Sequence, residues 1–315
     1  MEVPLGIGDD AAVVRARRGR EWVVSTDAFV EGCHFLSRLH TPHAVGYKAL
    51  ARAVSDLAAM GATPRYFLLT LALPGRKAGR WLDEFARGMA LAARRFDIRL
   101  IGGDVSRHDR VAAALAVIGD TQRSRALTRS GARPGDALYV SGRLGAAQDG
   151  LEMLLRAGAR GAARREDSYS VERHLYPVPR LELGSWLAAQ RLASAAMDVS
   201  DGLSTDLGRL CAASGLGAVV HAGALPMARD ERPGARRGET VRARATELRR
   251  ALDGGEDYEL LFTVPRRLTS RIPHAFRGVP ITRIGELTAG RTVLLEENGR
   301  MRKLRARGWE HFGRR

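Results

Sequence analysis

The spacing of apolar residues predicts alternating strands and helices in the first 120 residues. Short apolar or alternating runs predict strands at 20–27, 66–74, 99–103 and 110–120. Apolar positions at helical spacing predict helices at 43–60 and 81–96. Gly61 is a suitable stop for the first helix, with Pro64 just beyond it. The first half of the chain therefore has an α/β pattern.

A second unit is predicted after the arginine-rich loop 121–136, beginning near the Pro134–Gly135 turn. Its predicted strands are 137–142, 196–201, 217–222, 258–264, 281–287 and 292–297, and its predicted helices are 146–158, 179–193 and 203–215. Residues 159–175 are charged and predicted to be a loop. Eight arginines in 226–250 predict a solvated helix and its approach loop. A chain of 315 residues favours two domains, here 1–134 and 135–315.

Aspartates recur where apolar runs stop, each beside glycine, serine or threonine. The stretches are GIGDDAAVV (6–14), VVSTDAF (23–29), AVSDLAAMGA (53–62), RLIGGDVS (99–106) and AMDVSDGL (196–203). Each alone also fits a turn, a helix cap or a solvated acid. Carboxylates pack poorly in a core and bind hard cations well. Together the five stretches predict one polyvalent cation site assembled from distant parts of the chain.

Two of these stretches carry their own geometric expectations. Alternation along a strand sends neighbouring side chains to opposite faces, so Ser25, Thr26 and Asp27 reach one ion only if the strand bends. Asp56 lies in an otherwise apolar helix, so it faces either solvent or a positive group. Residues 6–11 formally match a dinucleotide fingerprint, but no useful strand precedes them and two acids would repel a pyrophosphate.

Charge and composition first suggest a nucleic-acid-binding protein, since the net charge is +16. Lysine occurs only three times, the arginines are scattered, and aromatic residues are 6% of the chain, so no basic stacking platform is predicted. Cys33 and Cys211 match no metal spacing and predict reduced thiols in a cytoplasmic protein. No apolar run approaches the ~20 residues that cross a bilayer, so no membrane association is expected. P-loop, HExxH and GxSxG motifs do not occur.

A series of motifs resembles the thiamine-monophosphate kinase family, within the aminoimidazole-ribonucleotide-synthetase-like superfamily. The resemblance runs from Leu5 to Phe312, and its motifs in family order are GIGDDAA, STDAFVEGCHF, YKALARAVSDLAAMGA, LIGGD, ALTRSGARPGD, DVSDGLSTDLG, GGEDYEL and GWEHF. It implies ATP-dependent phosphorylation of thiamine monophosphate to thiamine diphosphate. It also implies a two-domain α+β or α/β fold, in which mixed N-terminal sheets of two subunits close into a barrel across a homodimer. The C-terminal domain is then an α/β sandwich, and ATP binds near the domain junction.

The resemblance also implies a set of site residues. Matched magnesium ligands are Asp10, Ser25, Thr26, Asp27, Asp56, Asp104, Asp198 and Asp201, for several Mg²⁺ ions per site. Matched ATP contacts are Gly103, Asp104, Arg129 and Ser200, and matched thiamine-phosphate contacts are His34, Glu256 and Trp309. No general base is expected, because a phosphomonoester has a second pKa of about 6 and is already ionised near neutral pH.

One departure from the family lies at the start, where its members carry a further segment with a helix ahead of the GIGDD turn. The nearest alternative is another ATP-using enzyme of the superfamily: aminoimidazole ribonucleotide synthetase, selenophosphate synthetase or the hydrogenase-maturation dehydratase. Selenophosphate synthetase would need a reactive cysteine in the early glycine-rich region, whereas Cys33 follows the STD turn. The maturation enzyme would end in cysteine, whereas this chain ends in HFGRR. A basic nucleic-acid-binding protein is the remote alternative.

Overall fold

The computed structural model describes residues 18–162, 168–228, 241–310 and 312. Asp10 and the GIGDD stretch lie outside the described residues. The chain divides into two compact units. Unit 1 comprises residues 1–126, 154–165 and 175–185, and unit 2 comprises 127–153, 166–174 and 186–315.

Unit 1 contains a four-stranded mixed sheet with the order β1-β4-β2-β3. Its strands are β1 (Arg20–Val30), β2 (Thr63–Leu73), β3 (Arg99–Arg107) and β4 (Ala112–Gln122). Strands β1 and β2 each pair with β4 in antiparallel fashion, and β3 adds to β2 in parallel. Strands β1 and β3 are therefore the two edges of the sheet as the structure describes it.

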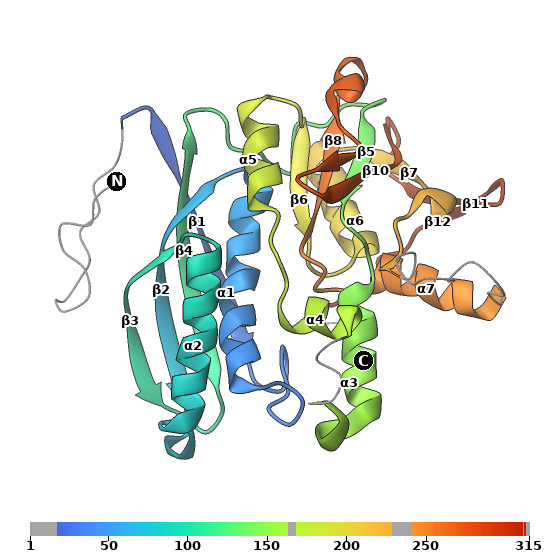
Figure 1. Cartoon of the computed structure of the whole chain (residues 1–315). Helices are drawn as coiled ribbons and strands as arrows, with labels where there is room; N and C mark the ends of the chain where they lie inside the picture. Colours follow the sequence, from blue (N-terminus) through green and yellow to red (C-terminus); the bar gives the residue numbers. More distant parts are fainter. Residues whose placement is uncertain (1–17, 163–167, 229–240, 311, 313–315) are drawn as a thin grey trace. The chain divides into compact units, whose positions relative to one another are not determined.

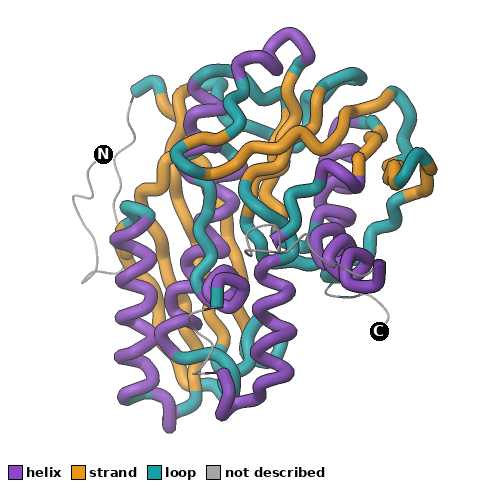
Figure 2. The backbone as a smooth tube through the Cα atoms, turned by 45° about the vertical axis from the view of Figure 1, so that its right-hand side comes forward, coloured by secondary structure: helices purple, strands orange, loops and turns teal. Residues whose placement is uncertain are grey.

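Helices α1 (Pro42–Ala59) and α2 (Arg80–Arg95) pack side by side along the sheet (Figure 1). The Thr41 hydroxyl caps α1 by accepting the Ala44 N–H at 3.2 Å, and Pro42 occupies the first turn. A Cβ at Gly46 would lie 1.9 Å from the Phe85 carbonyl oxygen, so glycine lets the two helices touch. The helices and the strands of unit 1 run alongside one another in Figure 2. Together they enclose the unit's apolar core.

The opposite face of this sheet is open. Trp22 and Val24 on β1 expose 36% and 65% of their surface, and Leu68 on β2 exposes 36%. These residues alternate with buried ones such as Val23 and Phe29, so the helix-covered face and the open face are set by the period of two along each strand.

Unit 2 is built on a mixed sheet with the order β12-β11-β7-β10-β5-β8-β6, and β9 pairs with β10. Its strands are β5 (Ala137–Ser141), β6 (Ala195–Val199), β7 (Gly217–His221), β8 (Glu259–Val264), β9 (Ala275–Phe276), β10 (Val279–Thr288), β11 (Val293–Glu297) and β12 (Arg300–Lys303). The helices after α2 are α3 (Ala146–Ala162), α4 (Tyr169–Leu175), α5 (Leu181–Ala189), α6 (Leu203–Ser214) and α7 (Val241–Asp253). Short 3₁₀ turns span Gly75–Lys77, Ala222–Ala224 and Arg266–Arg271.

The predicted α/β organisation is confirmed, with differences in the short elements. Helix α4 lies in a segment predicted as a loop, and β9 and β12 were not predicted. Strand β3 extends to Arg107, beyond the predicted end at residue 103. In the parts of the chain that the structure describes, every helix falls short of the length and apolarity that a bilayer crossing requires.

Candidate functional site

In unit 1, β1 and α1 bring polar residues together on the helix-covered face. The Ser25 hydroxyl on β1 donates a hydrogen bond to the Asp56 carboxylate on α1. Asp27, two residues further along β1, shares the face of Ser25. Sequence reasoning left Asp56 facing either solvent or a positive group. The structure places it against β1, beside two other oxygen ligands of the predicted metal set.

The negative charge of Asp27 is balanced by an arginine that sequence reasoning missed. The Arg52 guanidinium donates to both Asp27 carboxylate oxygens, with N–O distances of 3.2 and 3.3 Å. It also lies over the Phe29 ring, 5.1 Å from its centroid. Arg52 and Asp56 are four residues apart on α1, so they share one helix face. That spacing, opposite an acid-bearing strand, is the signal that could have identified Arg52.

Thr26 and Asp104 lie on the open face of the same sheet. Strand β1 pairs with β4 in continuous register from Arg20 to Val30, so it has no bend that would turn Thr26 toward Asp27. Asp104 on β3 is in register with Thr70, whose side chain is exposed on the open face. Thr26 and Asp104 thus share a face but belong to opposite edge strands.

Gly103, the predicted ATP contact, has a backbone that only glycine adopts without strain. Its φ is +154°, and a Cβ would lie 1.9 Å from the Leu69 carbonyl oxygen of the neighbouring strand. We expect Gly103→Ala to lower the free energy of unfolding by about 2 kcal/mol or more, because it separates β3 from β2. Thermal denaturation measures this loss.

Gly75→Ala is the matched control for that experiment. A Cβ at exposed Gly75 would approach nothing closer than 3.8 Å. An equal loss of stability in both variants would contradict a specific role for the close approach at Gly103.

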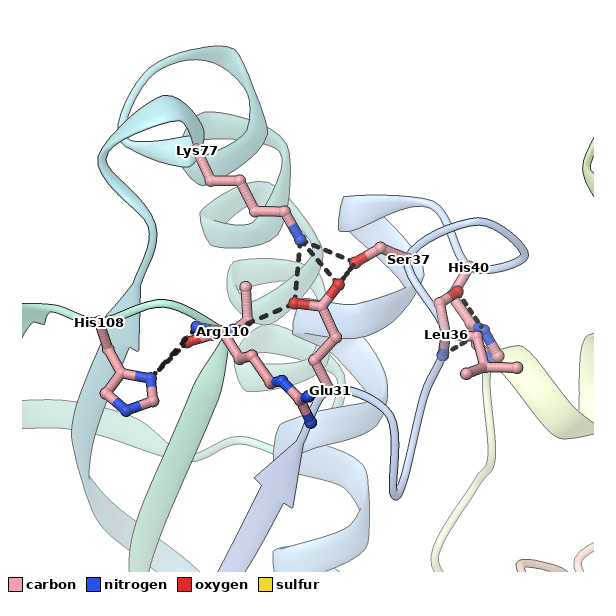
Figure 3. A network of polar contacts seen from close by, with 8 residues as sticks. Glu31, Leu36, Ser37, His40, Lys77, His108 and Arg110 are labelled. Carbon is pink, nitrogen blue, oxygen red and sulfur yellow. Dashed lines mark hydrogen bonds and ion pairs between the residues drawn. The ribbon is translucent and has the colours of Figure 1, made fainter.

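His34 follows β1 in a loop that a network around Glu31 holds in place (Figure 3). The Glu31 carboxylate accepts from Lys77 Nζ at 3.1 Å, the Val111 N–H at 3.1 Å and the Ser37 hydroxyl. Burial pushes the pKa of Glu31 upward, but these hydrogen bonds hold it below its ordinary value. His34 Nδ1 accepts the Val30 N–H at 3.0 Å, which fixes the ring at the end of β1.

In unit 2, Asp198 lies in β6, and the turn after this strand carries Ser200 and Asp201 ahead of α6. Its backbone is fixed by Asp206, which sequence reasoning did not assign. The fully buried Asp206 carboxylate accepts the N–H groups of Ser200 and Asp201 at 3.0 and 2.9 Å. Arg209 donates to Asp206 at 2.8 Å and also to the Asp201 carboxylate. Burial raises the pKa of Asp206 to about 6.

Glu256 and Trp309 converge on the same turn. The Glu256 N–H donates to the Ser200 carbonyl at 2.8 Å, and the Trp309 N–H donates to the Asp201 carbonyl at 2.9 Å. Glu256 has a φ of +68°, and its carboxylate lies 3.4 Å from Nδ1 of buried His174. Such strained backbone in a non-glycine residue is frequent at functional sites. Ser200, Asp201, Glu256 and Trp309 therefore form one group in unit 2.

The strained loop is anchored by Asp257, whose carboxylate accepts the N–H groups of Gly145 and Ala147 at 2.6 and 3.1 Å. Complete burial raises the pKa of Asp257 to about 7. A raised carboxyl pKa stabilises the fold most below the unfolded pKa, and this contribution is lost as pH rises through the folded value. We expect Asp257→Asn to reduce the fall in melting temperature between about pH 4 and pH 7.

Melting curves of both proteins across that pH range measure the effect. Asp83→Asn, at an exposed position of α2, serves as the control for loss of a surface acid. Parallel pH profiles for the natural protein and Asp257→Asn would contradict the assignment.

The structure does not bring every predicted residue together. The Arg129 carbonyl accepts the Ser214 hydroxyl at the end of α6, whereas the Ser200–Asp201 turn precedes its first residue. Those ends are about 18 Å apart. Among the described residues, no three histidine, cysteine, aspartate or glutamate side chains are close enough to hold a metal ion. The metal, ATP and substrate assignments stay predictions.

Comparisons with known proteins give the family. The model for the AIR synthase related protein N-terminal domain matches residues 8–121, and that for the C-terminal domain matches 133–296. Thiamine-monophosphate kinase of Escherichia coli K12 is 39% identical over 315 residues, covering 99% of this chain and 93% of the relative.

Solved structures agree with the sequence relatives. Thiamine-monophosphate kinase from Stenotrophomonas maltophilia K279a is similar with a TM-score of 0.80 and 36% identity, covering 93% of this chain and 91% of that one. AaThiL complexed with AMPPCP and TMP is similar with a TM-score of 0.77 and 32% identity, covering 97% and 92% of the two chains. From its motifs, its fold and these similarities, the chain belongs to the thiamine-monophosphate kinase family of AIR synthase related proteins.

Proposed function

We propose that the protein transfers the γ-phosphoryl group of ATP to thiamine monophosphate, giving thiamine diphosphate and ADP. The observation that carries this proposal is the group of oxygen ligands that β1 and α1 place together, on a chain similar over its length to AaThiL complexed with AMPPCP and TMP. The other superfamily enzymes are not favoured, because the relatives at 32–40% identity are thiamine-monophosphate kinases.

The chemistry needs charge neutralisation and positioning more than proton transfer. A phosphate oxygen of thiamine monophosphate forms a bond to the γ-phosphorus, and the bond to the oxygen bridging the β- and γ-phosphorus atoms breaks as ADP leaves. The acceptor oxygen is ionised near neutral pH, so no proton has to be removed from it. The two substrates are both anionic and repel each other. Alignment of the substrates and stabilisation of charge then supply most of the rate.

The donor set fits magnesium. Asp27, Asp56 and Ser25 offer only oxygen atoms in unit 1, as do Asp198 and Asp201 in unit 2. When bound, Mg²⁺ supplies positive charge to the phosphate oxygens. Asp27 and Asp201 are each held by an arginine, which balances the carboxylate charge. In this proposal both carboxylates would hold the metal, with Arg52 and Arg209 beside them.

The remaining family residues are proposed as substrate contacts. Trp309 exposes 41% of its surface while its backbone is tied to the Asp201 turn, and its ring is proposed to cover the cationic thiazolium. Glu256 lies against the same turn through its N–H bond to the Ser200 carbonyl. Gly103 and Ser200 are proposed to approach ATP through their backbone and hydroxyl groups. Arg129 is proposed to hold a phosphate through its long side chain.

We further propose a homodimer in which two unit 1 sheets close into an eight-stranded barrel. Three inter-strand spacings separate edge strands β1 and β3, or about 14 Å, so Thr26 and Asp104 do not meet within one sheet. A second copy that adds its β1 beside β3 would bring them to neighbouring strands, about 5 Å apart on the shared open face. Barrel closure would also cover Trp22 and Val24 and remove both edges.

Charges at the strand ends favour this pairing over pairing of like strands. Glu21 and Glu31 lie at the two ends of β1, whereas Arg99 and Arg107 are the terminal residues of β3. Parallel addition of β1 to β3 brings opposite charges together at both ends. Antiparallel pairing of two β3 strands about their centre would place Arg99 opposite Arg107. Each proposed site therefore combines β1 of one subunit with β3 of the other.

An assay of purified protein with ATP, Mg²⁺ and a panel of phosphomonoesters tests the activity. We expect ADP release to depend on both Mg²⁺ and thiamine monophosphate, with thiamine diphosphate identified by mass. ADP release with another phosphomonoester, but none with thiamine monophosphate, would overturn the proposal. We place the protein in the cytoplasm, since neither Cys33 nor Cys211 forms a disulfide among the described residues.

A further inference from the structure

A basic cavity in unit 2 is not used by the proposed reaction. It has a volume of about 370 Å³ and lies between α7 and residues 302–307, which follow from the end of β12. Its floor is apolar, formed by Leu248, Leu252 and Leu304, all nearly buried. This cavity includes the end of the arginine-rich segment that the sequence singled out.

Five exposed cationic side chains line the cavity: Arg302, which pairs with Glu297, and Arg249, Lys303, Arg305 and Arg307. Within the described part of the chain, no acidic side chain forms an ion pair with any of the last four. The cavity also contains two acids: Asp253 accepts the Ser204 hydroxyl at 2.7 Å, and Glu297 pairs with Arg302 at 3.6 Å. Five cationic side chains against two carboxylates leave an excess of positive charge for a ligand.

The shape and chemistry of the cavity select the class of ligand. An apolar floor beside a cationic rim fits a small organic molecule that carries several phosphate charges. Aromatic side chains do not occur among the cavity's lining residues, so it has no platform for stacking single-stranded bases. The geometry points to a binding site for a small organic diphosphate or triphosphate, separate from the predicted ATP and thiamine-phosphate contacts.

Hydrogen bonds connect this cavity to the turn that carries Asp201. The Ser204 hydroxyl, which donates to Asp253, also accepts the Arg307 N–H at 3.2 Å. The next two residues along the chain bind the same region: Gly308 N–H donates to Thr205 Oγ1 at 3.0 Å, and Trp309 N–H donates to the Asp201 carbonyl. A ligand held by Arg305 and Arg307 would therefore contact the segment that positions Trp309.

Equilibrium dialysis with radiolabelled ADP and, separately, thiamine diphosphate tests the proposal in the full-length protein with Mg²⁺. These arms distinguish a nucleotide from a thiamine source of the diphosphate. For at least one ligand, we expect two molecules bound per chain in the natural protein. We expect Lys303→Glu/Arg305→Glu to weaken one of these sites at least tenfold. The other site and the activity at saturating substrates should be retained.

Arg266→Glu/Arg267→Glu is the matched control, with the same charge change at exposed positions elsewhere in unit 2. It should bind as the natural protein does. One molecule per chain for both ligands, or equal weakening by both double variants, would overturn the proposal. Retention of a short oligonucleotide by the cavity, with neither diphosphate bound there, would instead assign it to nucleic acid. The number of ligand molecules bound per chain does not depend on catalytic turnover. A protein that binds two ligands but shows no kinase activity would therefore refute only the proposed reaction.

Discussion

Replacement of Asp56 by asparagine is expected to lower kcat by at least about 10³-fold, since a metal ligand supplies several kcal/mol of charge stabilisation. Asparagine retains an oxygen that accepts the Ser25 hydroxyl, so the contact between β1 and α1 survives. We therefore expect the melting temperature to change little. Steady-state kinetics with saturating ATP, Mg²⁺ and thiamine monophosphate measure the loss.

Asp83→Asn provides the comparison, because it makes the same chemical change at an exposed position of α2. Its kcat should equal that of the natural protein. Full activity of Asp56→Asn would remove Asp56 from the mechanism. A large fall in its melting temperature would show that Asp56 acts mainly on the fold.

Mixed dimers should reveal whether β1 and β3 of different subunits share a site. Thr26→Ala and Asp104→Asn homodimers are each expected to be inactive. A dimer of one chain of each kind, isolated through two different affinity tags, should show about half the activity of the natural dimer. One of its two sites then combines an intact β1 with an intact partner β3. Turnover per isolated dimer is the measurement.

The reciprocal mixture tests the same geometry with the opposite outcome. When one chain is natural and the other carries both Thr26→Ala and Asp104→Asn, every shared site contains one altered residue. This mixed dimer should be inactive. If it instead keeps half the activity while the first mixture has none, each site is made by a single chain.

The long elements of unit 1 were predictable because their regular apolar spacing repeats over many residues. Helix α1 runs from Pro42 to Ala59, close to the predicted 43–60, and its start is marked by Thr41 and Pro42. Short elements such as α4 and β12 depend on tertiary contacts. Strand β12 consists of exposed Arg300–Lys303 and is defined by its pairing with β11, which local sequence does not show.

Some features of the candidate site were likewise predictable from the sequence, and others were not. Acids at the ends of apolar runs drew attention to Asp27 and Asp56, and alternation on β1 indicated that Ser25, Thr26 and Asp27 reach one ion only if the strand bends. The regular register of β1 shows no such bend, so Thr26 faces away from Asp27. The partners Arg52 and Asp206 were missed, because a pairing partner becomes apparent only once separate elements are packed together. The metal contacts themselves stay predictions.

Crystals grown with Mn²⁺, a non-hydrolysable ATP analogue and thiamine monophosphate would test the central claim directly through anomalous scattering from the metal. The account predicts metal peaks about 2.1 Å from the carboxylate oxygens of Asp27 and Asp56, and a further peak on the open face at Asp104, beside Thr26 of the partner subunit. Metal peaks at the bound phosphates that contact none of these residues would contradict it.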